Sequence, residues 1–381
     1  MFKTFSFRKF DYLLLLLVLL QNMVGIMAIG SAQPELQLRQ IGGLLLGLTV
    51  MLLCAIPDYS RILRGYVLYY IVSIVLLVMV LVRGYAVGEA RRWFIVAGIR
   101  FQPSEAAKIL LILFYAAFIM KYKDRMRTLL QILICTALIL PPLFLVFREP
   151  DLSTTIMIFL IFCAMIFAGG MQYKYVATVF AGAVPVVIAF FFLVLQEGQS
   201  ILETWQQQRI LAWLHPEEYM DTTAYQTMYS IMAIGSGQVF GKGYNTNEIS
   251  SVLNSGYISE SQTDFVFTVI SEEFGFVGSC TVVALAFLIT LKCLLIARKA
   301  RDTGGMILAV GVGCWIGFQS FINIGVVSGV LPNTGLPLPF VSYGLTSLIC
   351  LYGGIGFVQN VAMQSGQAKA AQSAGRIRQK I

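Results

Sequence analysis

DYLLLLLVLLQNMVGIMAIG, the sequence of residues 11–30, holds one charged residue, at its first position, and consists mainly of Leu, Met, Ile and Val. An α-helix rises about 1.5 Å per residue, so about 20 such residues cross the roughly 30 Å hydrocarbon layer of a membrane. Similar apolar runs recur along the whole chain. This pattern predicts an all-α polytopic membrane protein.

We expect about ten transmembrane helices, with residues 1–381 forming a single membrane domain. The first run is not interpreted as a signal peptide, because no clean small-residue cleavage site follows it and many further spans do. The spans are expected near residues 11–30, 41–56, 66–82, 104–121, 128–147, 152–169, 175–196, 264–296, 305–331 and 342–363.

The composition supports this class of protein. Hydrophobic residues make up 58% of the chain, charged residues make up 12%, and the mean hydropathy is +0.79. The net charge of +8 is expected to reflect loops that face anionic lipids, and no nucleic-acid partner is predicted. The seven cysteines form no Cys-x-x-Cys pair and His215 is the sole histidine, so neither disulfides nor a metal site is predicted.

The distribution of positive charge predicts the orientation. With the N-terminus inside, 17 of the 27 Lys and Arg residues fall in inner segments and eight in outer ones. Because inner loops carry the excess of Lys and Arg, both termini are predicted to be cytoplasmic. Four of the eight outer cations crowd into the loop 83–100 against this bias, which suggests that they bind something anionic.

The segment 197–263, between the seventh and eighth spans, is too polar to cross the membrane and is predicted to be a long extracytoplasmic loop. We expect short helices along the outer leaflet, not a separate domain. Thr222 and Thr223 are candidate N-caps for one of them. The apolar residues that follow at helical spacing are Tyr225, Met228, Tyr229 and Met232.

Charged residues inside a span are costly and are therefore candidates for function. Glu105 and Lys108 lie three residues apart on one helix face near the outer end of the fourth span. The alternative is a mutually neutralising pair that only joins helices. Arg148-Glu149-Pro150-Asp151 forms a second charged cluster, in which Asp151 could instead cap the next helix.

Carboxylates also surround the start of the eighth span, where Ser259-Glu260-Ser261-Gln262-Thr263-Asp264-Phe265 precedes Glu272 and Glu273. Asp264 fits a helix N-cap, or a general base whose pKa would have to be raised by Glu260 or by burial. Local sequence does not separate these alternatives.

The last two spans are joined by PNTGLPLPFVSYG, residues 332–344, which is too rich in Pro and Gly to form a continuous helix. Irregular backbone at membrane depth persists where protein or a wet cavity satisfies its polar groups. We therefore expect this segment to form the floor of a cavity.

Together these motifs resemble the SEDS (shape, elongation, division and sporulation) family, and within it the RodA type, nearly from end to end. The resemblance implies a peptidoglycan glycosyltransferase of the bacterial cytoplasmic membrane, which polymerises lipid II on the outer face with a class B penicillin-binding protein for cell elongation and shape. It is carried by Ala90-Arg91-Arg92-Trp93, Arg100-Phe101-Gln102-Pro103-Ser104-Glu105 with Lys108, Glu149-Pro150-Asp151-Leu152, Gln208-Arg209, Ala233–Gly237, Thr263-Asp264-Phe265 with Glu272-Glu273, and Gly335–Gly344.

The resemblance also implies roles for residues. Asp264 corresponds to the family's essential acid and is expected to activate the acceptor hydroxyl, while cations hold the undecaprenyl diphosphate of the substrate. No cofactor is required, although a divalent cation could supply part of the positive charge. One departure is that the family's Gln-Pro-Asp-Leu-Gly-Thr reads Glu-Pro-Asp-Leu-Ser-Thr at residues 149–154. The residues expected to bind substrate are Arg92, Glu105, Lys108, Arg148, Asp151, Ser342 and Tyr343.

Two other functions fit parts of the sequence. A lipid-linked oligosaccharide flippase or transporter would also need a cavity with buried charges. It should have gates on both sides, whereas the polar clusters here are predicted on the outer side. A non-catalytic scaffold for cell-wall enzymes would tolerate loss of the Asp264 carboxylate.

Overall fold

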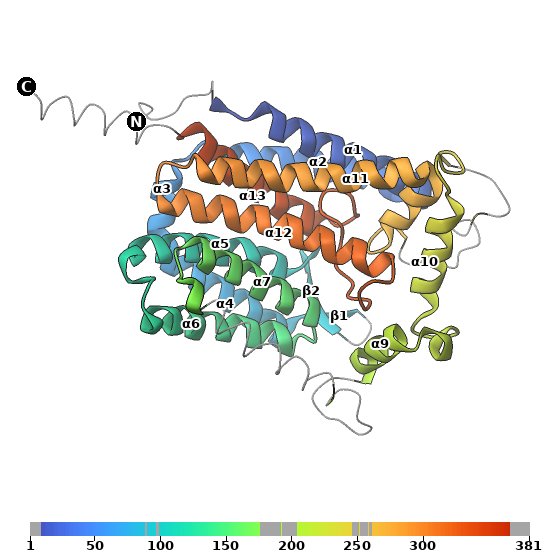
Figure 1. Cartoon of the computed structure of the whole chain (residues 1–381), viewed down its shortest axis with the longest axis horizontal. Helices are drawn as coiled ribbons and strands as arrows, with labels where there is room; N and C mark the ends of the chain where they lie inside the picture. Colours follow the sequence, from blue (N-terminus) through green and yellow to red (C-terminus); the bar gives the residue numbers. More distant parts are fainter. Residues whose placement is uncertain are drawn as a thin grey trace, which may run out of the picture.

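The computed structural model of the protein describes residues 9–87, 90–96, 99–175, 192, 204–245, 251, 258 and 261–365. Within these ranges the long helices run side by side in one bundle (Figure 1). They are α1 (Tyr12–Ala32), α2 (Pro34–Ala55), α4 (Tyr66–Arg83), α5 (Pro103–Lys121), α6 (Leu129–Arg148), α7 (Leu152–Ala168), α11 (Val266–Arg298), α12 (Thr303–Val327) and α13 (Leu345–Met363).

Eight helices in the described ranges are long and apolar enough to cross a membrane, and α7 is a shorter apolar helix of 17 residues. One of the eight joins the short α3 (Tyr59–Ile62) and η2 (Leu63–Gly65) to α4. These helices confirm the predicted multi-span architecture. The expected seventh span, 175–196, lies almost wholly outside the described residues. Glu260, Lys3, Arg8 and the basic residues after residue 365 also lie outside them.

Local sequence explains where several helices begin. Asp11 caps α1 by accepting a hydrogen bond from the Leu14 backbone N–H at 2.9 Å, and Asp302 caps α12 through Gly305 at 2.8 Å. Lys9 donates to the Ser365 carbonyl, so the described chain starts and stops at the same end of the bundle. This agrees with the prediction that both termini lie on the same side of the membrane. We call this end the inner end and the opposite end the outer end, as the charge distribution predicts.

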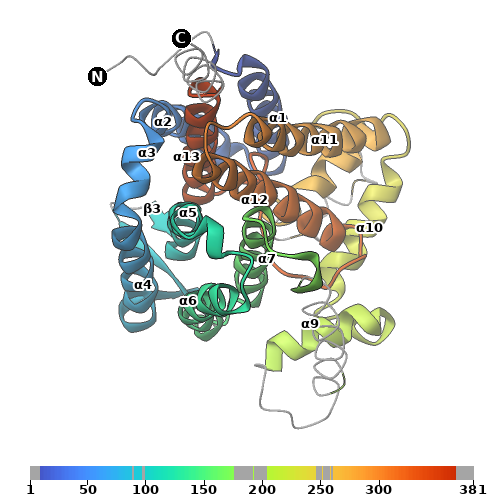
Figure 2. The same ribbon diagram turned by 60° about the vertical axis from the view of Figure 1, so that its left-hand side comes forward.

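Helix α13 lies at the centre of the bundle, and most of its side chains are buried. It packs against α2, α5 and α12. Figure 2 shows α5, α6 and α7 on one side of α12, and α1 and α11 on the other. Helix α4, by contrast, has few buried side chains, which fits a position against lipid. The central helices are therefore distinguished from the peripheral ones by being buried on all faces.

The loop 83–100 contains a feature that the sequence analysis did not predict. It forms a three-stranded antiparallel sheet in the order β1 (Tyr85–Val87), β2 (Ala90–Val96), β3 (Ile99–Phe101). Tyr85 pairs with Trp93, and Phe94 pairs with Phe101. The aromatic and β-branched residues of β2 favour a strand. The strands were not predicted because they are short and lie between much longer apolar runs.

The described part of the long outer loop packs against the bundle. Helices α9 (Thr204–Leu214) and α10 (Tyr225–Ser236) are joined through η4 (Pro216–Tyr219), and α10 crosses the outer ends of α11 and α12 (Figure 1). Trp213 of α9 donates to the Gly329 carbonyl at 3.2 Å, and Ser230 of α10 donates to the Val327 carbonyl at 2.9 Å. The expected capping by Thr222 or Thr223 is wrong, because Ala224 is the N-cap.

Helix α11 is broken near its outer end. Gly275 has φ 64° and ψ −156°, a conformation that favours glycine and interrupts the α-helical backbone. The 33 residues of α11 exceed the length that a single membrane crossing requires, and the break divides them into two helical segments. Phe276 and Val277, just after the break, donate backbone hydrogen bonds to Gln238 and Val239 of the outer loop.

Candidate functional site

The segment 332–344 is irregular, as its sequence predicts, and four side chains from three helices donate hydrogen bonds to its backbone carbonyls. This arrangement allows non-helical backbone to persist within the bundle. The donors are Asn22 of α1 to Phe340 at 2.9 Å, Gln40 of α2 to Ser342 at 3.3 Å, and Gln319 and Asn323 of α12 to Pro337 at 2.8 Å and Leu336 at 2.7 Å.

Asp264 lies two residues before the start of α11 and beside this segment. The N-cap of α11 is Phe265, so Asp264 does not occupy the capping position that its sequence allowed. The backbone carbonyl of Asp264 accepts a hydrogen bond from Asn323 at 2.7 Å. A Cβ built on Gly335, whose φ is +69°, would lie 3.3 Å from Asp264 Oδ2. The segment 332–344 thus brings its backbone close to the Asp264 carboxylate.

Arg92 joins the small sheet to the turn between α6 and α7. Its Nε donates to the Glu149 carbonyl at 3.2 Å, and Nη2 donates to the Pro150 carbonyl. Its Nη1 lies 3.7 Å from Asp151 Oδ2. Asp151 also caps α7 by accepting from the Thr154 N–H at 3.0 Å. The two interpretations of Asp151, as helix cap and as member of a charged site, are therefore compatible.

Arg209 of α9 brings a second guanidinium to the same place. Burial lowers its pKa, and the nearby charge of Arg92 acts in the same direction, whereas Asp264 and Asp151 act in the opposite direction. Arg209 of α9 therefore interacts electrostatically with residues of β2, of the start of α7 and of the turn before α11. We call Arg92, Asp151, Arg209 and Asp264 the outer charge cluster.

Arg209 is not among the site residues predicted from the sequence. The signal was present, since Gln208-Arg209 is one of the motifs that carry the family resemblance. From the residues alone, however, an arginine in a polar outer loop resembles any solvated charge. Its half-buried position depends on how α9 packs, which the sequence pattern does not show.

Lys108 and Glu105 lie deeper, in the interior of the bundle. Lys108 Nζ donates to Glu105 Oε1 at 2.7 Å and to Gln319 Oε1 at 3.0 Å, and lies 4.9 Å from the centre of the Trp315 ring. Neither charged side chain is more than 2% exposed. The predicted pair is confirmed, but the ammonium does not face the outside in this structure.

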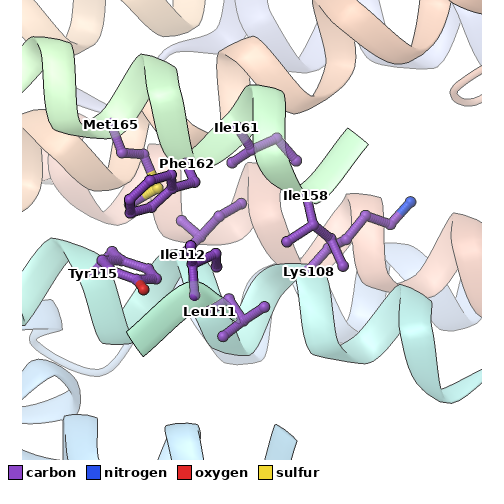
Figure 3. A pocket seen from close by; sticks show the side chains of 9 residues that line it. Lys108, Leu111, Ile112, Tyr115, Ile158, Ile161, Phe162 and Met165 are labelled. Carbon is purple, nitrogen blue, oxygen red and sulfur yellow. The ribbon is translucent and has the colours of Figure 1, made fainter. Parts of the chain in front are cut away.

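The stem of Lys108 also lines a small apolar cavity between α5, α6 and α7. Figure 3 shows its ammonium pointing away from the aromatic end of this cavity, where Tyr115, Phe162 and Met165 gather. Gln319, which binds the ammonium, also holds the Pro337 carbonyl. The Lys108 charge is therefore coupled to the segment beside Asp264.

The structure gives the remaining predicted site residues different surroundings. Arg148 is the last residue of α6 and is exposed, without a hydrogen bond or ion pair to the described residues. The buried Ser342 hydroxyl donates to the Thr263 carbonyl and accepts from the Leu338 N–H, and the Tyr343 N–H donates to the Gln262 carbonyl at 2.9 Å. The contacts of Ser342 with Thr263 and of Tyr343 with Gln262 hold the backbone just before Asp264 in place.

Glu149 is an unusual neighbour of the outer charge cluster. Its side chain is fully buried, and neither carboxyl oxygen has a hydrogen-bond partner among the described residues. Burial raises its pKa from 4.5 to about 9, the charge of Asp151 adds to this rise, and Arg92 opposes it. Glu149 therefore carries a proton at neutral pH, so the family's neutral Gln is replaced by a neutral acid.

The described residues contain no group of three or more His, Cys, Asp and Glu side chains placed to hold a metal ion. The outer charge cluster instead combines two carboxylates with two arginines. Such an arrangement can accept a proton and bind an anionic group at neighbouring positions. Any part played by a divalent cation stays a prediction.

The fold and the outer charge cluster define a multi-pass membrane protein whose charged site is built into one end of a helix bundle. The chain belongs to the FtsW/RodA/SpoVE family, the SEDS family, because residues 6–367 match the family's sequence model, described as "cell cycle protein". This match confirms the resemblance inferred from the motifs.

Relatives agree over most of the chain. The peptidoglycan glycosyltransferase MrdB of Escherichia coli K12 is 35% identical over 351 residues, covering 92% of this chain and 91% of that protein. The rod shape determining protein RodA of Thermus thermophilus has a similar structure, with a TM-score of 0.68 and 27% identity over 94% of this chain and 98% of that one.

A second solved structure extends the comparison to an assembly. One chain of the structure described as "Structural coordination of polymerization and crosslinking by a peptidoglycan synthase complex" matches with a TM-score of 0.77 and 29% identity. The match covers 93% of this chain and 97% of that chain.

Proposed function

We propose that the protein is a peptidoglycan glycosyltransferase that polymerises lipid II on the outer face of the bacterial cytoplasmic membrane for cell elongation and shape. The outer charge cluster is the observation that carries this proposal. It places a carboxylate beside two arginines at the membrane end where a lipid-linked sugar diphosphate would be presented. The names of the relatives support the same activity.

In the proposed reaction, a sugar hydroxyl of the acceptor attacks the anomeric carbon of the lipid-linked donor. The new glycosidic C–O bond forms as the bond between that carbon and the diphosphate oxygen breaks. Asp264 takes the hydroxyl proton, and the leaving lipid diphosphate carries away the electron pair. Arg92 and Arg209 stabilise its negative charge, because guanidinium groups can donate two parallel hydrogen bonds to phosphate.

The inner polar residues are assigned a positioning role in this proposal. Lys108, held by Glu105, acts through Gln319 on the segment that lies against Asp264. Ser342 and Tyr343 hold the backbone just before that acid. Direct contact of these residues with substrate would require a conformation more open than the one described.

The proposal includes a class B penicillin-binding protein as the partner that crosslinks the product. Its support is the match to a chain of a peptidoglycan synthase complex that coordinates polymerization and crosslinking. Exposed apolar helix faces are available for such a partner, but they serve equally well as surfaces for membrane lipids.

The test compares glycan polymer made from lipid II by wild type and Asp264→Asn, each purified with its candidate penicillin-binding partner. The substitution preserves side-chain size and removes the base, so polymer should fall by at least about a hundredfold. Asp302→Asn is the matched control, because Asp302 caps α12 at the inner end and Asn also caps helices well. Equal polymer from wild type and a folded Asp264→Asn variant would contradict the proposed base.

A further inference from the structure

The outer half of α6 carries an open apolar hollow that the proposed chemistry does not use. Its volume is about 600 Å³, which lies in the range of roughly 300–1,000 Å³ typical of ligand sites. The lining residues are Ala137, Leu140, Pro141, Leu143, Phe144 and Phe147 of α6, and Thr155 of α7.

Two adjacent prolines shape this part of α6. Pro141 and Pro142 lie inside the helix and lack the N–H that would bond to the preceding turn. Pro142 is buried, whereas Leu140 and Phe144 are exposed on the face that would meet lipid tails. Among the described residues, the hollow is therefore open on the face that would meet lipid tails.

One end of the hollow adjoins the outer charge cluster. The Thr155 hydroxyl donates to the Asp151 carbonyl at 2.8 Å, and the Asp151 carboxylate pairs with Arg92. Phe147, which lines the same end, lies two residues before Glu149, whose carbonyl binds Arg92. From Ala137 to Phe147 the helix rises about 15 Å, so the hollow extends from the cations toward the middle of the bilayer.

We propose that this hollow binds the isoprenoid chain of lipid II while the diphosphate lies at Arg92. A ligand that fits must have an anionic group at one end, followed by a long hydrocarbon. The surface of the protein has the matching order, with a cation at the outer end of α6 and apolar side chains toward the middle of the bilayer. The continuity between the apolar hollow and the cation selects such a ligand. This assignment rests on the proposed function, since it concerns the substrate of the same site.

Photo-crosslinking tests binding without requiring turnover. A photoreactive aromatic amino acid replaces Phe144 in full-length protein in nanodiscs, and purified lipid II is the probe. The matched control carries the same group at Leu130, which is exposed on the inner half of α6 outside the hollow. We expect lipid II adducts at position 144 at least about tenfold above position 130. If phospholipid reduces the adducts as effectively as lipid II does, the assignment is wrong. It is also wrong if lipid II is crosslinked to another part of the protein chain instead of position 144.

Kinetics then test the role of the hollow in substrate use. Ala137→Trp fills the hollow, whereas Leu133→Trp adds the same side chain to an exposed position outside it. Ala137→Trp should raise KM for lipid II about tenfold, equivalent to about 1.4 kcal/mol, without changing kcat. The KM for an analogue with a short isoprenoid chain should stay the same. Equal KM values for the two variants would reject the proposal. If wild type makes no polymer, the glycosyltransferase proposal fails, and the crosslinking result alone decides whether the hollow binds lipid II.

Discussion

At Glu149, burial controls the charge state of a single side chain. A carboxyl without hydrogen-bond partners strongly favours its neutral form inside protein. Its folded-state pKa of about 9 lies above the ordinary 4.5, so between these pH values the folded protein binds more protons than the unfolded chain. The free energy of unfolding should therefore decrease as the pH rises through this range.

Glu149→Gln should remove this pH dependence. The variant keeps the side-chain shape without the ionisable group, so its stability relative to wild type should improve steadily above pH 4.5 and level off near pH 9. The gain between pH 5 and pH 8 is expected to be about 1–3 kcal/mol. Thermal unfolding of the detergent-solubilised protein across this pH range measures it.

Glu35→Gln, at an exposed position near the start of α2, is the control for this measurement. It should leave the pH profile of wild type unchanged. If Glu149→Gln shifts stability by the same amount at every pH, Glu149 is ionised in the folded state and the interpretation is wrong.

At the same scale, single functional residues were more predictable from the sequence than the residues they contact. Helical spacing predicts the Glu105–Lys108 pair, because three residues separate two charges on one face. Gln319, which binds the same ammonium, lies 211 residues further along the chain, and Gln is common in helices of every kind. A contact of this separation depends on packing, which local periodicity does not contain.

Among the elements, the break in α11 shows how the outer loop is attached. Interrupting a helix leaves backbone groups without partners. Lys242 and Gly243 donate to the Glu272 and Glu273 carbonyls at 2.9 and 3.0 Å, and the Lys242 ammonium lies 2.7 Å from the Glu272 carboxylate. The outer loop thus replaces hydrogen bonds that a continuous helix would have made within itself.

Gly275→Ala should disrupt this attachment. A Cβ at Gly275 would lie 2.4 Å from the Gly241 backbone nitrogen, and the φ of 64° disfavours any residue with a side chain. We expect a loss of at least about 3 kcal/mol in the free energy of unfolding. Thermal unfolding and protease cleavage within residues 237–245 measure the loss and the release of the loop.

Gly42→Ala provides the comparison, because nothing lies within 4 Å of the Cβ it would add in α2. Alanine there should stabilise the helix by about 0.5–1 kcal/mol. A Gly275→Ala variant as stable and as protease-resistant as Gly42→Ala would show that the junction tolerates a side chain.

The long spans were predictable because each needs only an apolar run of membrane-crossing length. The sheet was missed although Trp93-Phe94-Ile95-Val96 has strong β propensity, since its strands are short and lie between charged residues. The break at Gly275 leaves no change in composition along the run. The break depends on the backbone conformation of one glycine, and many other glycines in the sequence could adopt that conformation, so its position cannot be predicted from the sequence.

Across the whole molecule, the outer charge cluster depends on chain segments that are distant in sequence. Arg92, Asp151, Arg209 and Asp264 come from four different elements and meet at the end opposite Lys9 and Ser365. The sequence predicts their side of the membrane through the charges of the loops. It does not predict their mutual contacts, which require the helices to pack in one particular arrangement.

The orientation itself can be tested with single cysteines in a variant whose seven native cysteines are replaced by Ala. Thr222→Cys lies at an exposed turn of the outer loop, and Asp124→Cys lies in the exposed η3 (Lys123–Arg125) between α5 and α6. Because Lys and Arg are enriched on the cytoplasmic side, a membrane-impermeant maleimide should label only Thr222→Cys in intact spheroplasts. Asp124→Cys should react after permeabilisation.

The result bears on the proposed function, because an outward-facing cluster is required to meet a sugar that has already been carried across the membrane. Labelling of Asp124→Cys in intact spheroplasts, with Thr222→Cys protected, would place Arg92 and Asp264 in the cytoplasm. Polymerisation of lipid II outside the cell by this cluster would then be excluded, whatever the purified protein does in detergent. The predicted pattern would instead place the base, the arginines and the apolar hollow of α6 in the outer half of the membrane, where a donor with an inserted isoprenoid chain presents its diphosphate.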